Sequence, residues 1–205
     1  MKKIIEFFFY VIQRCLFPWG LFSFLKNKRK ELRSYWIRGV FKSCPRSVRF
    51  GIIGDLQGPK YISVADKVCF ADWIYLTAWE TYGEQKFTPA LSIGKHCNFG
   101  AFNHISCINK IEIGDNCLTG KWVTIVDNDH GKTDPDSLSQ PPAHRNIVSK
   151  GPVIIGKNVW IGDKATILAG VTIGDGVVVA ANTVVTQSVP ENCIVVGNPS
   201  RIIKR

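Results

Sequence analysis

The strongest constraint in this sequence is a six-residue repeat. From residue 153 the chain reads VIIGKN, VWIGDK, ATILAG, VTIGDG, VVVAAN and TVVTQS. The third residues of these units are Ile155, Ile161, Ile167, Ile173, Val179 and Val185. A period of six fits neither an α-helix nor an alternating strand. It predicts short strands separated by tight turns, three to a coil, with the aliphatic residues pointing inward and the coils stacked as a parallel β-helix.

The same period occurs upstream and then breaks. Three earlier runs have the same spacing: Val64, Phe70 and Leu76; Ile93, Phe99 and Ile105; Ile113, Thr119 and Ile125. The period stops at residue 126 and resumes at residue 153, and the segment between them is rich in Asp, Pro, Ser and Gly, as loops are. We therefore predict an all-β solenoid over 51–205 with one loop, residues 127–150, ejected from the coils. Long loops in compact folds usually carry function.

Charge and aromatic residues are concentrated at the N-terminus. Residues 1–50 contain twelve of the 26 Lys and Arg residues but only two of the 16 acidic residues, so this segment carries the whole net charge of +10. It also contains twelve of the 23 aromatic residues. A nucleic-acid-binding protein more often carries its excess positive charge on the folded body, so we expect no nucleic-acid partner.

The N-terminal segment, residues 1–50, is predicted to be a helical arm. Lys3, Glu6, Tyr10 and Gln13 form a narrow polar stripe on an otherwise apolar helix. Aromatic residues beside basic ones suit the headgroup layer of an anionic membrane, so one hypothesis is peripheral membrane contact through residues 1–40. The alternative is that the arm caps the open end of the coils. No run of about 18 uncharged apolar residues occurs, which rules out a clean transmembrane helix.

The cysteines and the N-terminus indicate a cellular compartment. The seven cysteines are odd in number and form no C-x-x-C pair, so neither a disulfide framework nor a zinc ribbon is indicated. Buried thiols in a reducing compartment explain them. The early apolar stretch lacks a small-residue cleavage site, which argues against a secretory signal. We expect a cytoplasmic protein, at the inner membrane face if the arm binds lipid, with no metal.

The C-terminal repeats resemble a known family. Residues 151–205 resemble the hexapeptide-repeat acyltransferases, and the resemblance covers roughly 90–205. The usual ending of that family reads here as Gly197-Asn198-Pro199-Ser200-Arg201-Ile202-Ile203. It is closest to sugar O-acetyltransferases of the maltose, galactoside and nodulation-factor type and to their relatives in lipopolysaccharide and capsule gene clusters. The resemblance implies a left-handed β-helix, a homotrimer, acetyl-coenzyme A as donor, and a sugar hydroxyl of a cell-envelope glycan or its lipid-linked precursor as acceptor.

One histidine at the start of the loop is the candidate base. Transfer of an acetyl group to a hydroxyl needs a base, and imidazole titrates nearest the working pH. His130 stands where this family has its catalytic histidine, so the resemblance implies that His130 is the base. A nearby carboxylate would fix the imidazole tautomer, and Asp127 and Asp129 are the first candidates, with Asp134 and Asp136 behind them. The alternative is a solvated histidine in a polar turn.

The resemblance also implies a donor site and an acceptor site. The donor residues are Trp160, Gly162, Asp163, Ala181, Thr186, Gln187, Arg201, Lys204 and Arg205. Among them, the Asp163 N–H is a candidate oxyanion donor beside the thioester, Ala181 matches a small residue beside the pantetheine arm, and the C-terminal basic residues match those near the nucleotide. Gln187 departs from the family, which has a lysine there. The alternative role for Trp160 is packing at the rim of the core. Asn103 and His104 are candidates for the acceptor sugar, with a corner cap as the alternative for Asn103.

Other functions remain open on the sequence alone. The same donor site would serve an N-acetyltransferase that acts on an amino sugar. A zinc hydratase related to the γ-class carbonic anhydrases needs three converging histidines, and the spacing of the four histidines does not resemble that family. A third hypothesis is a non-catalytic scaffold on the same fold.

Overall fold

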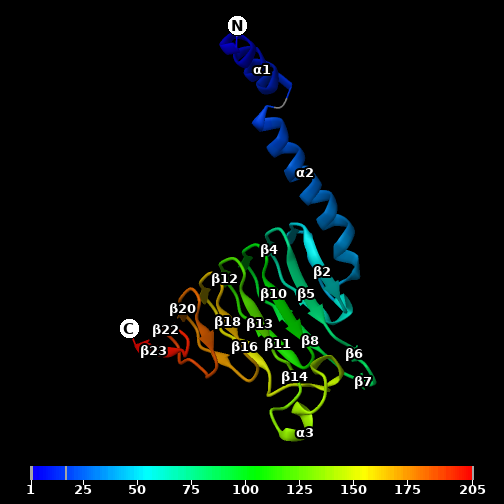
Figure 1. Cartoon of the computed structure of the whole chain (residues 1–205), viewed down its shortest axis with the longest axis vertical. Helices are drawn as coiled ribbons and strands as arrows, with labels where there is room; N and C mark the ends of the chain where they lie inside the picture. The colour runs from blue at the N-terminus through cyan, green and yellow to red at the C-terminus, as the bar shows by residue number, and fades with distance from the viewer. Residues whose placement is uncertain (1, 17, 205) are drawn as a thin grey trace.

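The computed structural model describes residues 2–16 and 18–204 and shows a body wound through three parallel sheets (Figure 1). The first sheet has the order β1 (Arg49–Phe50), β4 (Cys69–Phe70), β9 (Asn98–Phe99), β12 (Leu118–Thr119), β17 (Trp160–Ile161), β20 (Val178–Val179), β22 (Cys193–Val196) and β23 (Arg201–Lys204). The second has the order β2 (Ile53–Gln57), β5 (Ile74–Ala78), β10 (His104–Cys107), β13 (Thr124–Val126), β18 (Thr166–Ile167) and β21 (Val184–Val185). The third has the order β19 (Thr172–Ile173), β16 (Val153–Ile155), β11 (Lys110–Ile113), β8 (Ala90–Ile93) and β3 (Ile62–Val64).

The core follows the six-residue period. The inward residues that the six-residue spacing predicts, from Val64 to Val185, are each at most 4% exposed. At the N-terminal end the core is aromatic: the rings of Phe41, Phe50, Phe70 and Phe99 stack in sequence, with centroids 5.2, 4.9 and 5.0 Å apart. Each coil therefore places its inward residue directly on that of the next coil, and the prediction of the core positions is confirmed.

Two segments interrupt the coils. The predicted loop leaves after β13 and returns before β16, and it contains β14 (Asp129–His130), α3 (Pro135–Leu138), η3 (Pro142–His144) and β15 (Ile147–Val148). Strands β14 and β15 pair antiparallel. A second interruption, between β5 and β8, forms the hairpin of β6 (Thr81–Tyr82) and β7 (Gln85–Lys86). This hairpin was not predicted, although the spacing of 17 residues between Leu76 and Ile93 marks it in the repeat.

The arm consists of α1 (Lys2–Leu16) and α2 (Trp19–Ile37), followed by η1 (Arg38–Val40), and it projects beyond the first coil (Figure 1). Only its end acts as a cap: the Ser34 hydroxyl is buried, donates to the Lys30 carbonyl at 2.7 Å and accepts from the Phe50 N–H at 2.8 Å. In α1 no residue is buried. The capping alternative therefore holds for the end of α2, while α1 has no covering element among the described residues.

The N-terminal part differs in two respects from the sequence prediction: in where the body begins and in its suitability as a membrane span. Ser43 already bridges to Ser63, and β1 pairs with β4, so the body begins inside the segment 1–50. A short helix, η2 (Pro59–Tyr61), follows β2. By length and composition alone, the stretch Lys2–Val40 passes as a membrane span, because its most apolar 18-residue window has a mean hydropathy of 1.3 and is 0% buried. Two charged residues, Glu6 and Arg14, are too few to exclude a span by length and composition, so that exclusion was too strict.

Candidate active site

The loop and the hairpin meet at His130. His130 lies on β14 opposite Ile147 of β15, and its imidazole is exposed. The ring of Tyr82, on the hairpin, meets the imidazole edge to face with centroids 5.5 Å apart. The Tyr82 hydroxyl lies 3.0 Å from the Ala143 carbonyl and 3.5 Å from His130 Nδ1. Tyr82 and His130 are 48 residues apart in sequence, so the two insertions that carry them together form one site.

The hydrogen-bonding inventory at Tyr82 selects a tautomer for His130. A phenol has one proton to donate, and a backbone carbonyl can only accept. The Tyr82 O–H therefore donates to the Ala143 carbonyl, and the Tyr82 oxygen is left as an acceptor facing His130 Nδ1. An acceptor at Nδ1 favours the tautomer in which Nδ1 carries the hydrogen, which leaves the lone pair on Nε2. This is the arrangement that a general base requires.

The hairpin also holds the returning half of the loop. The Gln85 side chain accepts from the Ile147 N–H at 2.7 Å and donates to the Ile147 carbonyl at 3.1 Å. Because Ile147 pairs with His130, these two bonds keep the strand opposite the imidazole in place. Gln85 itself makes no contact with the imidazole among the contacts of the described residues. Position and tautomer are therefore supported by different side chains of one hairpin.

Asp127 is a structural residue at the start of the loop. Its carboxylate is fully buried and accepts from the backbone N–H groups of Ile108 and Asn109 at 2.8 and 2.9 Å. The thiol of Cys107 donates to it at 3.3 Å. Burial, together with the Asp127 carboxylate, raises the pKa of the Cys107 thiol, which keeps that thiol protonated as a donor. All of these contacts hold the corner from which the loop departs.

The predicted carboxylate partner of His130 needs correction. The carboxylate of Asp127 faces backbone donors inside the prism, as described above. Asp129 is the neighbour of His130 on a strand, so its side chain points to the opposite face, and it pairs with Lys150 at 3.3 Å. Asp134 caps α3 through the Ser137 N–H at 2.9 Å, and this bond lowers the pKa of the Asp134 carboxyl. Within the described residues, Tyr82 occupies the place expected for a carboxylate.

The two candidate acceptor residues lie on opposite sides of the sheet surface. Asn103 is 1% exposed; its amide oxygen accepts from the Val123 N–H at 2.8 Å and its amide nitrogen donates to the Thr119 hydroxyl. These bonds match the corner-cap alternative and place Asn103 beneath the surface that a sugar can reach. His104 points outward from β10, edge to face with Tyr75. Partial desolvation lowers the pKa of His104, and the Asp55 carboxylate opposes this shift.

Three predicted donor residues come together at one corner of the prism. Gly162 packs so closely on the next coil that an added Cβ would lie 2.6 Å from the Ala181 nitrogen. In the preceding coil, the Lys121 N–H that follows the corner glycine donates to the Asp163 carboxylate at 2.8 Å. Ala181 stands at the equivalent place in the coil after Asp163 and has no carboxylate to offer. Among the described residues the Asp163 N–H therefore has no acceptor, as an oxyanion donor requires.

The remaining donor residues are spread over the C-terminal coils. Thr186 and Gln187 are exposed at the corner that follows β21. That corner lies two strands along the sheet from the loop root after β13, about 10 Å at ordinary strand spacing. Arg201 is exposed on β23, which turns back antiparallel on β22. Lys204 ends β23, but its side chain and Arg205 lie outside the described part of the structure.

Trp160 lies on the outer face of the first sheet, paired with Leu118. The two side chains are 54% and 48% exposed, so Trp160 is not a core-rim residue. At the neighbouring corner, the rings of Trp73, Phe102 and Trp122 stack with centroids 6.4 and 4.1 Å apart; the two tryptophans are exposed and Phe102 is half-buried. Over residues 2–16 and 18–204 no group of three His, Cys, Asp or Glu residues is placed to hold a metal.

Comparison with known proteins identifies the repeat. The profile described as "Hexapeptide repeat of succinyl-transferase" matches residues 90–120 and 152–187. A putative lipopolysaccharide biosynthesis O-acetyl transferase of Escherichia coli, WbbJ, is 41% identical over 105 residues, which cover 50% of this chain and 54% of that protein. The galactoside O-acetyltransferase of Escherichia coli is 32% identical over 139 residues, 64% of this chain and 60% of that one. The chain thus matches little more than half the length of these relatives.

Solved structures agree on the fold. AntD, an N-acyltransferase from Bacillus cereus in complex with dTDP and 3-hydroxybutyryl-CoA, superimposes with a TM-score of 0.65 at 24% identity, covering 84% of this chain and 87% of that chain. The polySia-specific acetyltransferase NeuO superimposes with a TM-score of 0.53 at 26% identity, covering 70% of this chain and 56% of NeuO. The repeat profile therefore identifies hexapeptide repeats in this chain, the curated relatives show its similarity to sugar O-acetyltransferases, and the solved structures agree with it in fold.

Proposed function

We propose that this protein is an acetyl-coenzyme A-dependent O-acetyltransferase that modifies a sugar hydroxyl of a cell-envelope glycan or its lipid-linked precursor. The names of the relatives support the reaction class, and the coenzyme A complexes of the neighbouring structures support the donor. The observation that carries the proposal at this site is the imidazole of His130, exposed at the loop root with Tyr82 on Nδ1. The left-handed sense of the coils, which the resemblance implies, is part of the same proposal.

In the proposed reaction His130 acts as general base. Nε2 takes the proton of the acceptor hydroxyl as its oxygen attacks the carbonyl carbon of the acetyl thioester. The negative charge that develops on the carbonyl oxygen is stabilised by the Asp163 N–H. The tetrahedral intermediate collapses, the carbon–sulfur bond breaks, and the leaving thiolate recovers the proton from Nε2. The products are the acetyl ester and coenzyme A, with no acyl-enzyme intermediate.

The test is replacement of His130 in the purified chain. His130→Ala is expected to lower kcat by two to four orders of magnitude, roughly the contribution of general acid–base catalysis. Coenzyme A binding, measured by calorimetry, should persist because the imidazole is not among the donor residues. Acetyl transfer to a panel of envelope glycans and amino sugars, followed by mass spectrometry, would define the acceptor. Near-normal turnover by a folded His130→Ala protein would remove His130 from the mechanism.

We further propose that the chain assembles as a homotrimer. The exposed apolar side chains of Leu118, Trp160, Trp73 and Trp122 support this, since exposed apolar surface marks interaction sites. A repeated copy of the chain is the partner that the family resemblance implies. A molecular mass equal to that of a single chain, measured by sedimentation equilibrium, would refute the trimer.

The arm supports a proposed location. We propose a cytoplasmic protein held at the inner membrane face through residues 1–40. The support is the concentration of the whole net positive charge in residues 1–50 together with the exposure of α1. Recovery of the native protein in the soluble fraction only, at low salt, would refute this location.

A further inference from the structure

The surface of the arm is apolar beyond what a water-exposed helix normally carries. In α1, Ile4, Phe7, Phe8, Phe9 and Leu16 are each more than 60% exposed. In α2, Trp19 is 79% and Leu32 68% exposed. Contiguous apolar surface of this size on a soluble protein marks a site of contact with a partner or a membrane. Helix α1 also lies far from the body, on the side away from α3 (Figure 1), where no described element shields it.

The charge of α2 identifies the chemistry of that partner. This helix carries five basic residues, Lys26, Lys28, Arg29, Lys30 and Arg33, and a single acidic one, Glu31. Glu31 pairs with Lys28 at 2.9 Å. A second copy of the same arm would bring like charges together, whereas an anionic surface complements them. Charge complementarity therefore favours an anionic lipid surface over self-association.

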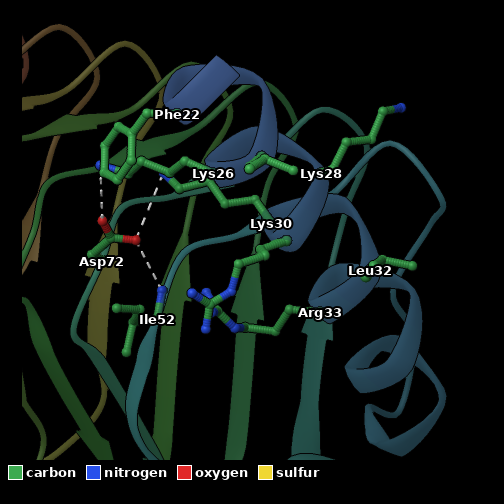
Figure 2. A pocket seen from close by; sticks show the side chains of 10 residues that line it. Phe22, Lys26, Lys28, Lys30, Leu32, Arg33, Ile52 and Asp72 are labelled. Carbon is green, nitrogen blue, oxygen red and sulfur yellow. Dashed lines mark hydrogen bonds and ion pairs between the residues drawn. The ribbon is translucent and has the colours of Figure 1, made fainter. Parts of the chain in front are cut away.

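A groove lies between α2 and the first coils (Figure 2). Its volume is about 590 Å³, which is in the range of small-ligand sites. The apolar part of its wall is formed by Phe22, Leu25, Leu32 and Ile52, and the polar part by the five basic residues of α2 and by Asp72. The groove thus combines an apolar wall with cationic groups, as the junction between an acyl chain and a phosphate requires.

One carboxylate arranges the cationic side of the groove. Asp72 accepts from the Ile52 N–H at 3.0 Å and lies 3.7 Å from Lys30 Nζ and 3.9 Å from Lys26 Nζ. Figure 2 shows these two lysines extending from α2 toward Asp72. Arg29 and Arg33 line the same groove and have no ion-pair partner within residues 2–16 and 18–204. After one carboxylate is counted, the groove keeps an excess of positive charge that includes two guanidinium groups.

We propose that this groove binds the phosphate of an anionic membrane lipid, with Arg29 and Arg33 on the phosphate and the lipid chain along Phe22 and Leu25. Guanidinium groups bind phosphate with two parallel hydrogen bonds, a geometry that lysine lacks. The exposed apolar residues of α1 then contact the acyl chains beside the bound lipid. The site does not depend on the proposed acetyl transfer, because none of its residues belongs to the candidate active site, but it rests on the proposed location at the membrane.

The test compares two double variants of the full-length chain. Arg29→Gln with Arg33→Gln removes the groove guanidinium groups, and Lys42→Gln with Arg46→Gln removes the same charge from exposed positions outside the groove. Flotation with vesicles of phosphatidylglycerol and phosphatidylcholine measures the affinity, and phosphatidylcholine vesicles alone serve as the uncharged reference. A basic residue near an anionic membrane contributes roughly fivefold in affinity, so loss of both groove arginines should weaken binding by about 25-fold.

The control pair should weaken vesicle binding at least fivefold less than the groove pair. Circular dichroism and thermal unfolding check that both proteins are folded. Equal losses in the two pairs would overturn the site, because diffuse surface charge would then explain the binding. Failure of the native chain to float with phosphatidylglycerol vesicles at low salt would also overturn it. So would arm-dependent self-association with no lipid binding, since the partner would then be a second copy.

Discussion

Replacement of Tyr82 by phenylalanine tests how His130 is positioned. The change removes one oxygen atom and keeps the ring that packs against the imidazole at 5.5 Å. Two bonds are lost, one to the Ala143 carbonyl at 3.0 Å and one at 3.5 Å to Nδ1. A neutral hydrogen bond contributes about 0.5–1.5 kcal/mol net, and the contact with Nδ1 is at the long end of the accepted range.

The expected effect falls on the chemical step. With about 1 kcal/mol of support for the reactive tautomer removed, kcat should drop about fivefold. The KM for acetyl-coenzyme A should stay unchanged, because no predicted donor residue contacts Tyr82. Steady-state kinetics with a saturating acceptor separate these two parameters. His130→Ala provides the reference, since Tyr82→Phe should have no further effect in a protein that already lacks the imidazole.

A matched control separates tautomer support from anchoring of the loop. Gln85→Ala removes two hydrogen bonds from the same hairpin to Ile147 but none to the imidazole. It should lower thermal stability with a smaller effect on kcat than Tyr82→Phe. If Gln85→Ala lowered kcat as much as Tyr82→Phe, loop anchoring would explain both results. If Tyr82→Phe left kcat unchanged, the assignment of the Nδ1 hydrogen would be refuted.

Two further predictions concern stability. Asp127→Ala leaves the N–H groups of Ile108 and Asn109 without their acceptor, at about 1–3 kcal/mol each, so Tm should fall by at least about 5 °C in calorimetry. Asp129→Asn, which removes only an exposed pair with Lys150, should change Tm by less than about 2 °C, and equal losses would contradict the structural role of Asp127. The pKa of His104 is lowered in the folded state, so the unfolded chain binds the proton first as pH falls through 6.5, and stability should decrease there. His104→Gln should reduce the drop in Tm between about pH 7.5 and 5.5, and an unchanged drop would count against this linkage.

The repeat made most of the body predictable, while the contacts of the site were not. A period of six places an aliphatic residue on each inner face whatever the outer residues are, so positions such as Ile105 and Val179 follow from spacing alone. The partner of His130 follows from where two insertions meet in space, and no local pattern near residue 82 indicates that meeting. Asp127 was misjudged for the same reason, because its buried donors, Ile108 and Asn109, come from the preceding coil.

The role of Ala181 becomes clear only when the stacked coils are aligned with one another. In sequence, Ala181 is one small residue among several in the last repeats. In other coils, an Asp at the position equivalent to Ala181 accepts from a backbone N–H of the preceding coil. Asp163 accepts in this way from the Lys121 N–H, and Asp175 accepts from the Lys157 N–H. The missing cap matters because of which N–H it leaves without an acceptor, and that depends on the stacking of coils rather than on composition.

The two ends of the coil have a consequence for assembly. A parallel coil that ended bare would offer its last row of N–H and C=O groups as a template for another chain. Here the Ser34 hydroxyl accepts a hydrogen bond from the Phe50 N–H at one end, and β23 folds back antiparallel along β22 at the other. In the first sheet, both ends are therefore protected against pairing with another chain. A deletion confined to α1 would keep this protection, whereas one that also removed the end of α2 would leave the Phe50 N–H without the Ser34 hydroxyl.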